Sequence, residues 1–234
     1  MTITTRAGKG SQLTHAELDT NFTDLRDGVS LQVPKTTNTG IKVDSLGTPT
    51  FGWHDLLGSL VTDPDDANRA VYTVYQTPVR QLLFIEAVSE AFIGFHMPHD
   101  YLPNSDIFIH AHWSHNSTIV TGGSVTFKFD CSYSKGHNQA AFSSSVPISV
   151  IQNASTTQYQ HMIAETAASV SGGSGVQLDT DDLEVDGLLL VRVTVDSNDI
   201  TSSGAIPDVF IHTVDIHYQS TGVPTKQRAP DFYT

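Results

Sequence analysis

The residues of this 234-residue chain best suited to chemistry are histidines that lie close together in the sequence. His110 and His112 are two residues apart in a segment of alternating apolar and polar character, so both imidazoles are expected on one face of a strand. His212 and His217 lie on the last expected strand. Two imidazoles at this spacing, joined by a third from a neighbouring strand, are a ligand set that can bind a metal ion.

A comparison with the metal enzymes of the cupin type leaves this metal pattern incomplete. Their motif has a Gly before the His-x-His pair and a Glu a few residues after it. Here Asn104 stands in place of the Gly, and Asn116 or Ser117 in place of the Glu. The sequence therefore predicts neither a metal site nor a cofactor. We expect the histidines to stack across a polar strand face or to lie at a subunit contact, and the candidate interface residues are His110, His112, Trp113, Phe232 and Tyr233.

Other catalytic arrangements are also incomplete. The acidic residues between Asp179 and Asp186 form one local run, whereas glycoside hydrolysis needs two carboxylates that face each other across a cleft. No nucleophile elbow is present, and Cys131 alternates with Phe127 and Phe129 as a core residue would. The segment Gly8-Lys9-Gly10-Ser11 lacks the spacing of a phosphate-binding loop. We predict no catalytic residues and no enzymatic activity.

The composition excludes several classes of partner. The net charge is −13 and the pI is about 5.0, and no cluster of Lys and Arg is available to neutralise phosphates, so no nucleic-acid partner is expected. The single cysteine cannot form an intrachain disulfide. No run of about 18 apolar residues is present, and the start lacks the apolar segment of a secretory signal. We therefore expect neither a membrane span nor secretion.

The elements that must position these residues begin with an N-terminal segment. Residues 1–12 lack periodicity and predict an extended arm, which is followed by a capping box at Thr14 and Glu17. A short helix is expected to follow, with one apolar face. Such a helix is too short to be stable alone in water, so its face should be buried against its own domain or against a partner. The expected docking residues are Arg6, Lys9, Leu13, Leu18, Phe22 and Leu25.

The rest of the chain predicts an all-β protein. We expect residues 1–62 to form the arm, short helix and extended linker, residues 63–220 a β-sandwich, and residues 221–234 a tail on the surface. Alternating patterns bounded by turn signals favour an antiparallel, jelly-roll-like sandwich, with an immunoglobulin-like sandwich as the alternative. The expected strands are 71–75, 80–86, 91–96, 106–114, 124–133, 141–151, 157–165, 187–195 and 209–219.

The N-terminal segment resembles one found in virion proteins of tailed bacteriophages. That segment has a basic T-R-x-G-K-G-S stretch, here 5–11, followed by L-T-x-x-E-x-D-x-N-F-x-x-L, here 13–25. The body also resembles a phage virion module through Phe95-His96-Met97-Pro98-His99-Asp100-Tyr101, Ser105-Asp106-Ile107 and His110-Ala111-His112-Trp113.

The resemblance implies a structural β-sandwich module, commonly homotrimeric and without catalytic residues. The function it implies is that of a capsid cement or decoration protein. Such a protein would lie on the capsid surface of the virion, with the major capsid protein and further copies of itself as partners. The alternative is a head or tail fibre, or receptor-binding protein, attached to the virion by its N-terminal segment.

Overall fold

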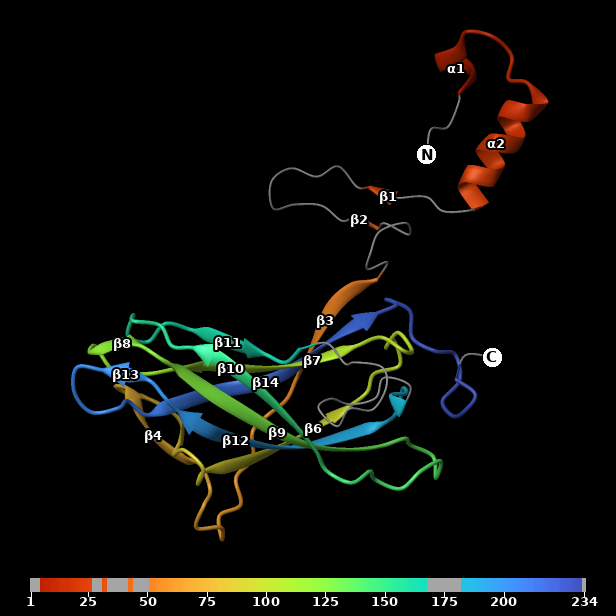
Figure 1. The fold of residues 1–234 in the computed structure, drawn as a ribbon. Helices are drawn as coiled ribbons and strands as arrows, with labels where there is room; N and C mark the ends of the chain where they lie inside the picture. Colours follow the sequence, from red (N-terminus) through yellow and green to blue (C-terminus); the bar gives the residue numbers. More distant parts are fainter. Residues whose placement is uncertain (1–4, 27–30, 33–41, 44–50, 168–181, 233–234) are drawn as a thin grey trace. The chain divides into compact units, whose positions relative to one another are not determined.

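The computed structural model describes residues 5–26, 31–32, 42–43, 51–167 and 182–232. The chain divides into two compact units, Met1–Gly52 and Trp53–Thr234. The first unit contains the helices α1 (Arg6–Lys9) and α2 (His15–Arg26) and the short strand pair β1 (Leu31–Gln32) and β2 (Lys42–Val43) (Figure 1). No helix among the described residues has both the length and the apolar character needed to cross a membrane.

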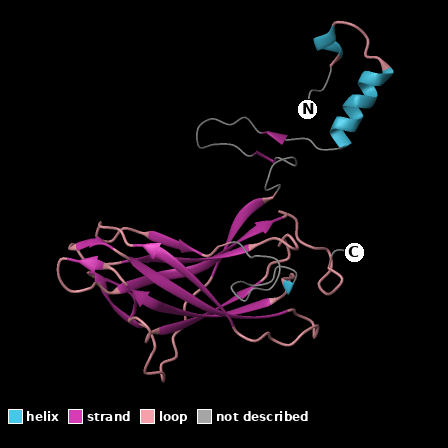
Figure 2. Cartoon of the chain, in the orientation of Figure 1, coloured by secondary structure: helices cyan, strands magenta, loops and turns pink. Residues whose placement is uncertain are grey.

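The second unit is a sandwich of two antiparallel sheets joined by loops (Figure 2). One sheet has the order β10-β9-β12-β6, with bounds β6 (Glu90–His96), β9 (Ser124–Ser134), β10 (Val146–Asn153) and β12 (Leu188–Asn198). The other has the order β11-β7-β14-β5-β4, and β3 also pairs with β14. Its bounds are β3 (Gly52–Leu57), β4 (Val71–Gln76), β5 (Val79–Phe84), β7 (Ile107–Ser114), β11 (Met162–Glu165) and β14 (Val209–Ser220).

The jelly-roll-like antiparallel sandwich is therefore present, and each of the nine expected strands is found. The two units divide after Gly52, ten residues before the expected boundary at residue 62, so residues 53–62 fall in the second unit. In this segment β3 pairs with β14, and Val61 exchanges backbone hydrogen bonds of 2.8 and 2.7 Å with Phe92. A further pair, β8 (Val120–Gly122) and β13 (Thr201–Ser202), was not expected.

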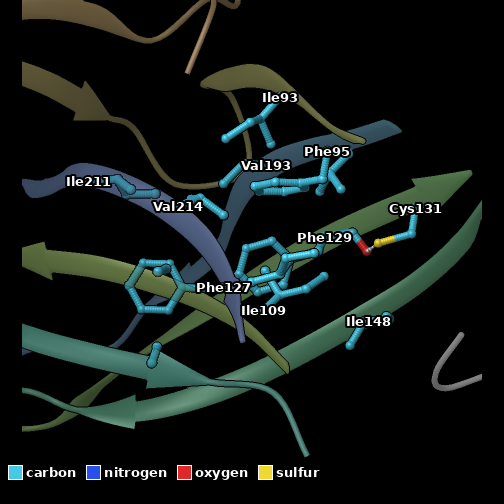
Figure 3. Packing of buried hydrophobic residues seen from close by; sticks show 14 of the residues in the cluster. Ile93, Phe95, Ile109, Phe127, Phe129, Cys131, Ile148, Val193, Ile211 and Val214 are labelled. Atoms are coloured by element: carbon cyan, nitrogen blue, oxygen red, sulfur yellow. Dashed lines mark hydrogen bonds between the residues drawn. The ribbon is translucent and has the colours of Figure 1, made fainter. Parts of the chain in front are cut away.

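The core lies between the two sheets and is built from alternate residues of each strand. In β9, Val125, Phe127, Phe129 and Cys131 are buried while the residues between them are more exposed. Figure 3 shows Phe127 and Phe129 close to Ile109 from β7, and Val214 from β14 belongs to the same buried cluster. Complete burial of a large apolar side chain contributes about 1.5–3 kcal/mol, so this interior stabilises the sandwich. Cys131 is fully buried in this core, which confirms its role in packing, and burial with a further contribution from Asp130 raises the pKa of its thiol to about 12.

The turn between β8 and β9 depends on one glycine. Gly123 has φ +87°, and a Cβ added there would lie 2.1 Å from the carbonyl oxygen of Asp199. Neither the backbone angle nor the available space suits another residue. This close approach lets Ser124 and Asp199 exchange backbone hydrogen bonds of 2.9 and 3.4 Å where β9 begins.

The C-terminal tail packs on the body rather than only lying over its surface. Backbone hydrogen bonds join Thr221 N to Asp100 O at 2.8 Å and Thr225 N to His99 O at 3.0 Å. Phe232 is buried and makes edge-on ring contacts with His99 and His137, with centroid separations of 5.8 and 5.7 Å. The tail is therefore part of the second unit.

Candidate functional site

The predicted capping box opens helix α2. The backbone N–H of Glu17 donates to Thr14 Oγ1 at 3.2 Å, and the N–H of Thr14 donates to Glu17 Oε2 at 2.7 Å. The Lys9 ammonium also pairs with Glu17. Hydrogen bonds from Lys9 and then from the Thr14 backbone lower the pKa of Glu17 to about 2. Through these contacts with Lys9 and Thr14, Glu17 links the segment that precedes α2 to the first turn of the helix.

One expectation for the arm needs correction. Residues 1–12 are not wholly extended, because Arg6–Lys9 form the helical turn α1, in which Lys9 N donates to Thr5 O at 3.0 Å. Lys9, one of the expected docking residues, pairs with Glu17 of its own unit. The side chain of Arg6 lies outside the described residues.

Helix α2 leaves its apolar residues exposed. Leu18 and Phe22 are one turn apart on the helix and are 38% and 68% exposed, and Leu13 is half-buried just before the helix. The side chain of Leu25, the next expected member of this face, lies outside the described residues. The core cluster of the protein contains residues from the second unit. Among the described residues, no member of that cluster comes from α2.

A second candidate site lies on the outer face of the sheet β11-β7-β14. Residues 109, 111 and 113 of β7 point into the core, so His110 and His112 point away from it, on one face as predicted. The strand register places His110 opposite Glu165 of β11 on one side and Asp215 of β14 on the other. This arrangement brings acidic and imidazole groups together from three neighbouring strands.

The contacts in this region are short. Nε2 of His110 lies 2.5 Å from Glu165 Oε2, and Nε2 of His112 lies 3.0 Å from Asp215 Oδ1. His217 pairs with Asp55 of β3, and the rings of His110 and His217 have centroids 3.8 Å apart. We call this group the histidine–carboxylate cluster, and its members are Asp55, His110, His112, Glu165, Asp215 and His217. Three different combinations of three residues from this cluster could hold a metal ion. In each combination, every residue offers one ligand atom, and the three atoms lie within 4.8 Å of one another.

Two further histidines border the cluster. His161 stacks on His112, with ring planes at 22° and Nε2 lying 2.8 Å from His112 Nδ1. His212 lies 2.7 Å from the Ser114 hydroxyl, which is 2.6 Å from the Tyr75 hydroxyl. Burial, together with the charges of His161 and His112, lowers the pKa of His212 to about 4. The expectation that histidines stack across a polar strand face is confirmed here.

A separate set of histidines surrounds Asp186 at another part of the body. His99 and His137 each approach this carboxylate to 2.9 Å, and His96 to 3.4 Å. Burial of Asp186 raises its pKa, but the hydrogen bond from His137 and the charges of the three histidines together outweigh burial and lower it. We call these four residues the Asp186 set. Of the acidic run that contains Asp186, Asp179 and Asp181 lie outside the described residues.

Most of the expected interface residues are buried within the single chain. Trp113 is 0% exposed and packs on Phe127, with ring centroids 5.3 Å apart, and Phe232 is 2% exposed. His110 is 3% exposed, because Glu165, Asp215 and His217 surround it. In this conformation none of the three offers a surface to a second subunit, which corrects that expectation. His112 is partly accessible, and Tyr233 lies outside the described residues.

The acidic members of the cluster were missed by the sequence reasoning. In place of the Glu expected after a cupin-type His-x-His pair, the carboxylates come from β3, β11 and β14. A local signal does exist for one of them. Asp215-Ile216-His217 has the same two-residue spacing as His110-Ala111-His112, and both segments lie on strands expected from their alternation.

Comparisons with known proteins leave the family open. No protein-family model matches the sequence, and no curated protein matches it. One solved structure similar to this chain contains the CBM22-1 and GH10 modules of the Clostridium thermocellum endo-1,4-β-D-xylanase 10B, in complex with xylohexaose. That match has 16% identity and a TM-score of 0.31, over 70% of this chain and 26% of that one, so the chain spans about a quarter of the xylanase chain.

Two further matches are carbohydrate-binding modules. The module CBM28, specific for non-crystalline cellulose, is 10% identical over 66% of this chain and 85% of its own, with a TM-score of 0.34. The xylan-binding module CBM15 is 11% identical over 82% of this chain and 99% of its own, with a TM-score of 0.32. The likeness concerns the β-sandwich architecture alone.

Proposed function

We propose that this protein is a capsid decoration protein of a tailed bacteriophage, which binds the assembled shell through its N-terminal unit. The observation that carries the proposal is the exposed pair Leu18 and Phe22 on a helix outside the sandwich unit. A helix of 12 residues is marginal in water by itself, so burial of this face against a partner would stabilise it. The phage-like sequence of the same segment supports the major capsid protein as that partner. The proposal gives the chain no catalytic role.

The docking contact would draw its free energy mainly from apolar burial. Transfer of a large apolar side chain from water into a partner groove contributes about 1.5–3 kcal/mol, so Leu18 and Phe22 together would contribute a few kcal/mol. The Lys9–Glu17 pair and the capping box hold the preceding turn against the helix. The segment thus enters the contact partly ordered, which lowers the entropy cost of binding.

Self-association as a homotrimer is supported by a groove on the outer face of the sheet β10-β9-β12-β6. Phe92 and Leu190 are 39% and 43% exposed there, and Val61 lies beside Phe92. Arg192 and Asp130 also line this groove, and exposed apolar residues bordered by polar ones are typical of interaction sites. A trimer would present three N-terminal units to one shell, and the linked contacts would raise the overall affinity through effective concentration.

The proposed mechanism is mechanical. A protein that binds the assembled shell but not its separated subunits stabilises the shell by mass action. The acidic body would remain outside and would not compete for the packaged genome, since it has no cluster of cations to neutralise phosphates.

The experiment that tests this proposal is co-sedimentation of purified variants with undecorated shells of the phage that carries this protein. Phe22→Asp places a charge in the apolar face of α2, and we expect it to reduce shell binding at least about tenfold, as loss of one buried anchor of roughly 1.4 kcal/mol or more would do. Thr20→Asp is the matched control, because Thr20 lies on the opposite side of the same helix and is exposed. Equal binding by both variants would overturn the docking role of this face.

A further inference from the structure

The histidine–carboxylate cluster contains one buried carboxylate placed between two imidazoles. Asp215 is only 3% exposed at its side chain, and its Oδ1 lies 3.0 Å from His112 Nε2 and 3.9 Å from His110 Nδ1. One ligand atom from each of these residues lies within 4.8 Å of the other two. We propose that His110, His112 and Asp215 bind one divalent transition-metal ion of the zinc class.

The separations suit a small tetrahedral ion. Zinc bonds to imidazole nitrogen at about 2.0–2.1 Å and to carboxylate oxygen at about 2.0–2.2 Å, so two of its ligand atoms lie roughly 3.4 Å apart. The two nitrogen–oxygen distances around Asp215 Oδ1 bracket that value from either side. Shifts of about half an ångström, within the reach of side-chain torsions, would bring the donors to ligand distance.

The other nitrogen of each histidine already has a partner. His110 approaches Glu165 through Nε2, which leaves Nδ1 toward Asp215, and His112 approaches His161 through Nδ1, which leaves Nε2 toward Asp215. Metal-bound histidines commonly donate their second ring N–H in this way, to a carboxylate or another acceptor, and so fix the tautomer. One consistent arrangement has His110 donating Nε2–H to Glu165 and His112 donating Nδ1–H to His161. Both remaining lone pairs would then face the ion.

Charge and burial favour a cation at this position. With neutral imidazoles the cluster contains three carboxylates, from Asp55, Glu165 and Asp215, and the Asp215 carboxylate is nearly inaccessible. A buried charge is costly unless it is paired or coordinates a metal. His112 is 18% exposed at its side chain, so this ligand can be reached from solvent.

The donor types select the class of ion. Two nitrogens and one oxygen suit zinc and neighbouring transition metals, whereas calcium and magnesium prefer oxygen ligands throughout. The Asp186 set also places three histidines around one carboxylate. Among the described residues, however, every combination of three residues whose ligand atoms lie within 4.8 Å of one another belongs to the histidine–carboxylate cluster. The Asp186 set therefore supplies an internal control.

An ion bound here would join β7 to β14 directly, and to β11 through Glu165. The site lies on the second unit and is independent of α2, so this inference goes beyond the proposed attachment to a shell. Its expected effect is a more stable sandwich, because a metal that binds the folded state selectively raises its stability.

The test uses the full chain, freed of metal by a chelator and dialysed. Zinc chloride is titrated into it by calorimetry, and the zinc retained after dialysis is counted. We expect about one tightly held zinc per chain, a higher unfolding midpoint, and no displacement by excess calcium or magnesium. A chain that retains no zinc, or that loses its zinc to calcium, would overturn the proposal.

Three variants make the test specific to the site. His112→Gln should abolish retention of that zinc, and it changes a partly accessible side chain, so the fold should survive. Glu165→Gln should weaken zinc binding about 10- to 100-fold, as changes beside a ligand typically do. His137→Gln, which changes a member of the Asp186 set, should leave zinc binding unchanged. Retention of zinc by His112→Gln, or an equal loss in His137→Gln, would show that the ion is held elsewhere.

Discussion

Replacement of His212 by glutamine should change how the stability of the protein depends on pH. In the folded chain, burial and the charges of His161 and His112 lower the pKa of His212 from 6.5 to about 4. The neutral ring can accept the hydrogen bond of the Ser114 hydroxyl, which can in turn accept that of Tyr75. Glutamine keeps a polar group near Ser114 but does not titrate.

The sign follows from where the proton binds. Below about pH 6.5 the unfolded chain protonates His212 while the folded chain does not, so the unfolded state is favoured as the pH falls toward about 4. One pKa unit corresponds to about 1.4 kcal/mol, but His212 is only partly buried, so solvent screening reduces the whole effect to about 1–2 kcal/mol. Between about pH 7.5 and pH 5 the contribution of His212 to stability is roughly 1 kcal/mol.

The assay is urea unfolding at several pH values in the presence of a chelator. The wild-type chain should lose about 1 kcal/mol more stability than His212→Gln between about pH 7.5 and pH 5. His15→Gln, which changes an exposed histidine of α2, is the control and should follow the wild type. Parallel pH profiles for the wild type and His212→Gln would refute the reasoning.

Two further predictions concern the architecture. Gly123→Ala should destabilise the sandwich by about 2 kcal/mol or more, because its Cβ would meet the Asp199 carbonyl, whereas Gly222→Ala, at φ +69° in open space, should cost only about 1 kcal/mol. Urea unfolding of both variants measures the difference, and equal costs would contradict the steric reason. Removal of residues 1–50 should leave the unfolding midpoint within about 2 °C of the full chain, since the core belongs to the second unit. A large fall in the calorimetric midpoint would contradict that division.

The strands of the sandwich could be predicted because they carry a local signal. β9 alternates between buried and more exposed residues along nearly its whole length, so its period of two is visible in the sequence. β3 has no such signal, since its residues are exposed or half-buried and glycines surround it. It forms by pairing with β14, a contact between distant parts of the chain. This is why the linker was expected to extend to residue 62.

Half of the histidine–carboxylate cluster was also visible in the sequence. The two-residue spacing of His110 and His112 placed them on one face, and the structure confirms it. Their acidic partners Glu165 and Asp215 are separated from them by 55 and 103 residues, and only the strand register brings them together. The same alternation puts Trp113 on the face opposite His112. It could therefore have shown that these two residues do not share one interface.

The helix and its capping box were predicted from local rules, and the structure confirms the reciprocal Thr14–Glu17 hydrogen bonds. The helical turn α1 was missed because a basic, glycine-containing stretch of four residues has no apolar periodicity. The pairing of Lys9 with Glu17 was missed for a related reason, since it depends on how the turn folds back toward α2.

The central claim is attachment to a phage shell, and an image reconstruction of the virion with a count of copies per particle tests it most directly. Our account predicts many copies at icosahedral positions, with residues 1–27 in contact with the major capsid protein and the sandwich outside. A handful of copies at the tail would contradict it and would favour a fibre or receptor-binding protein.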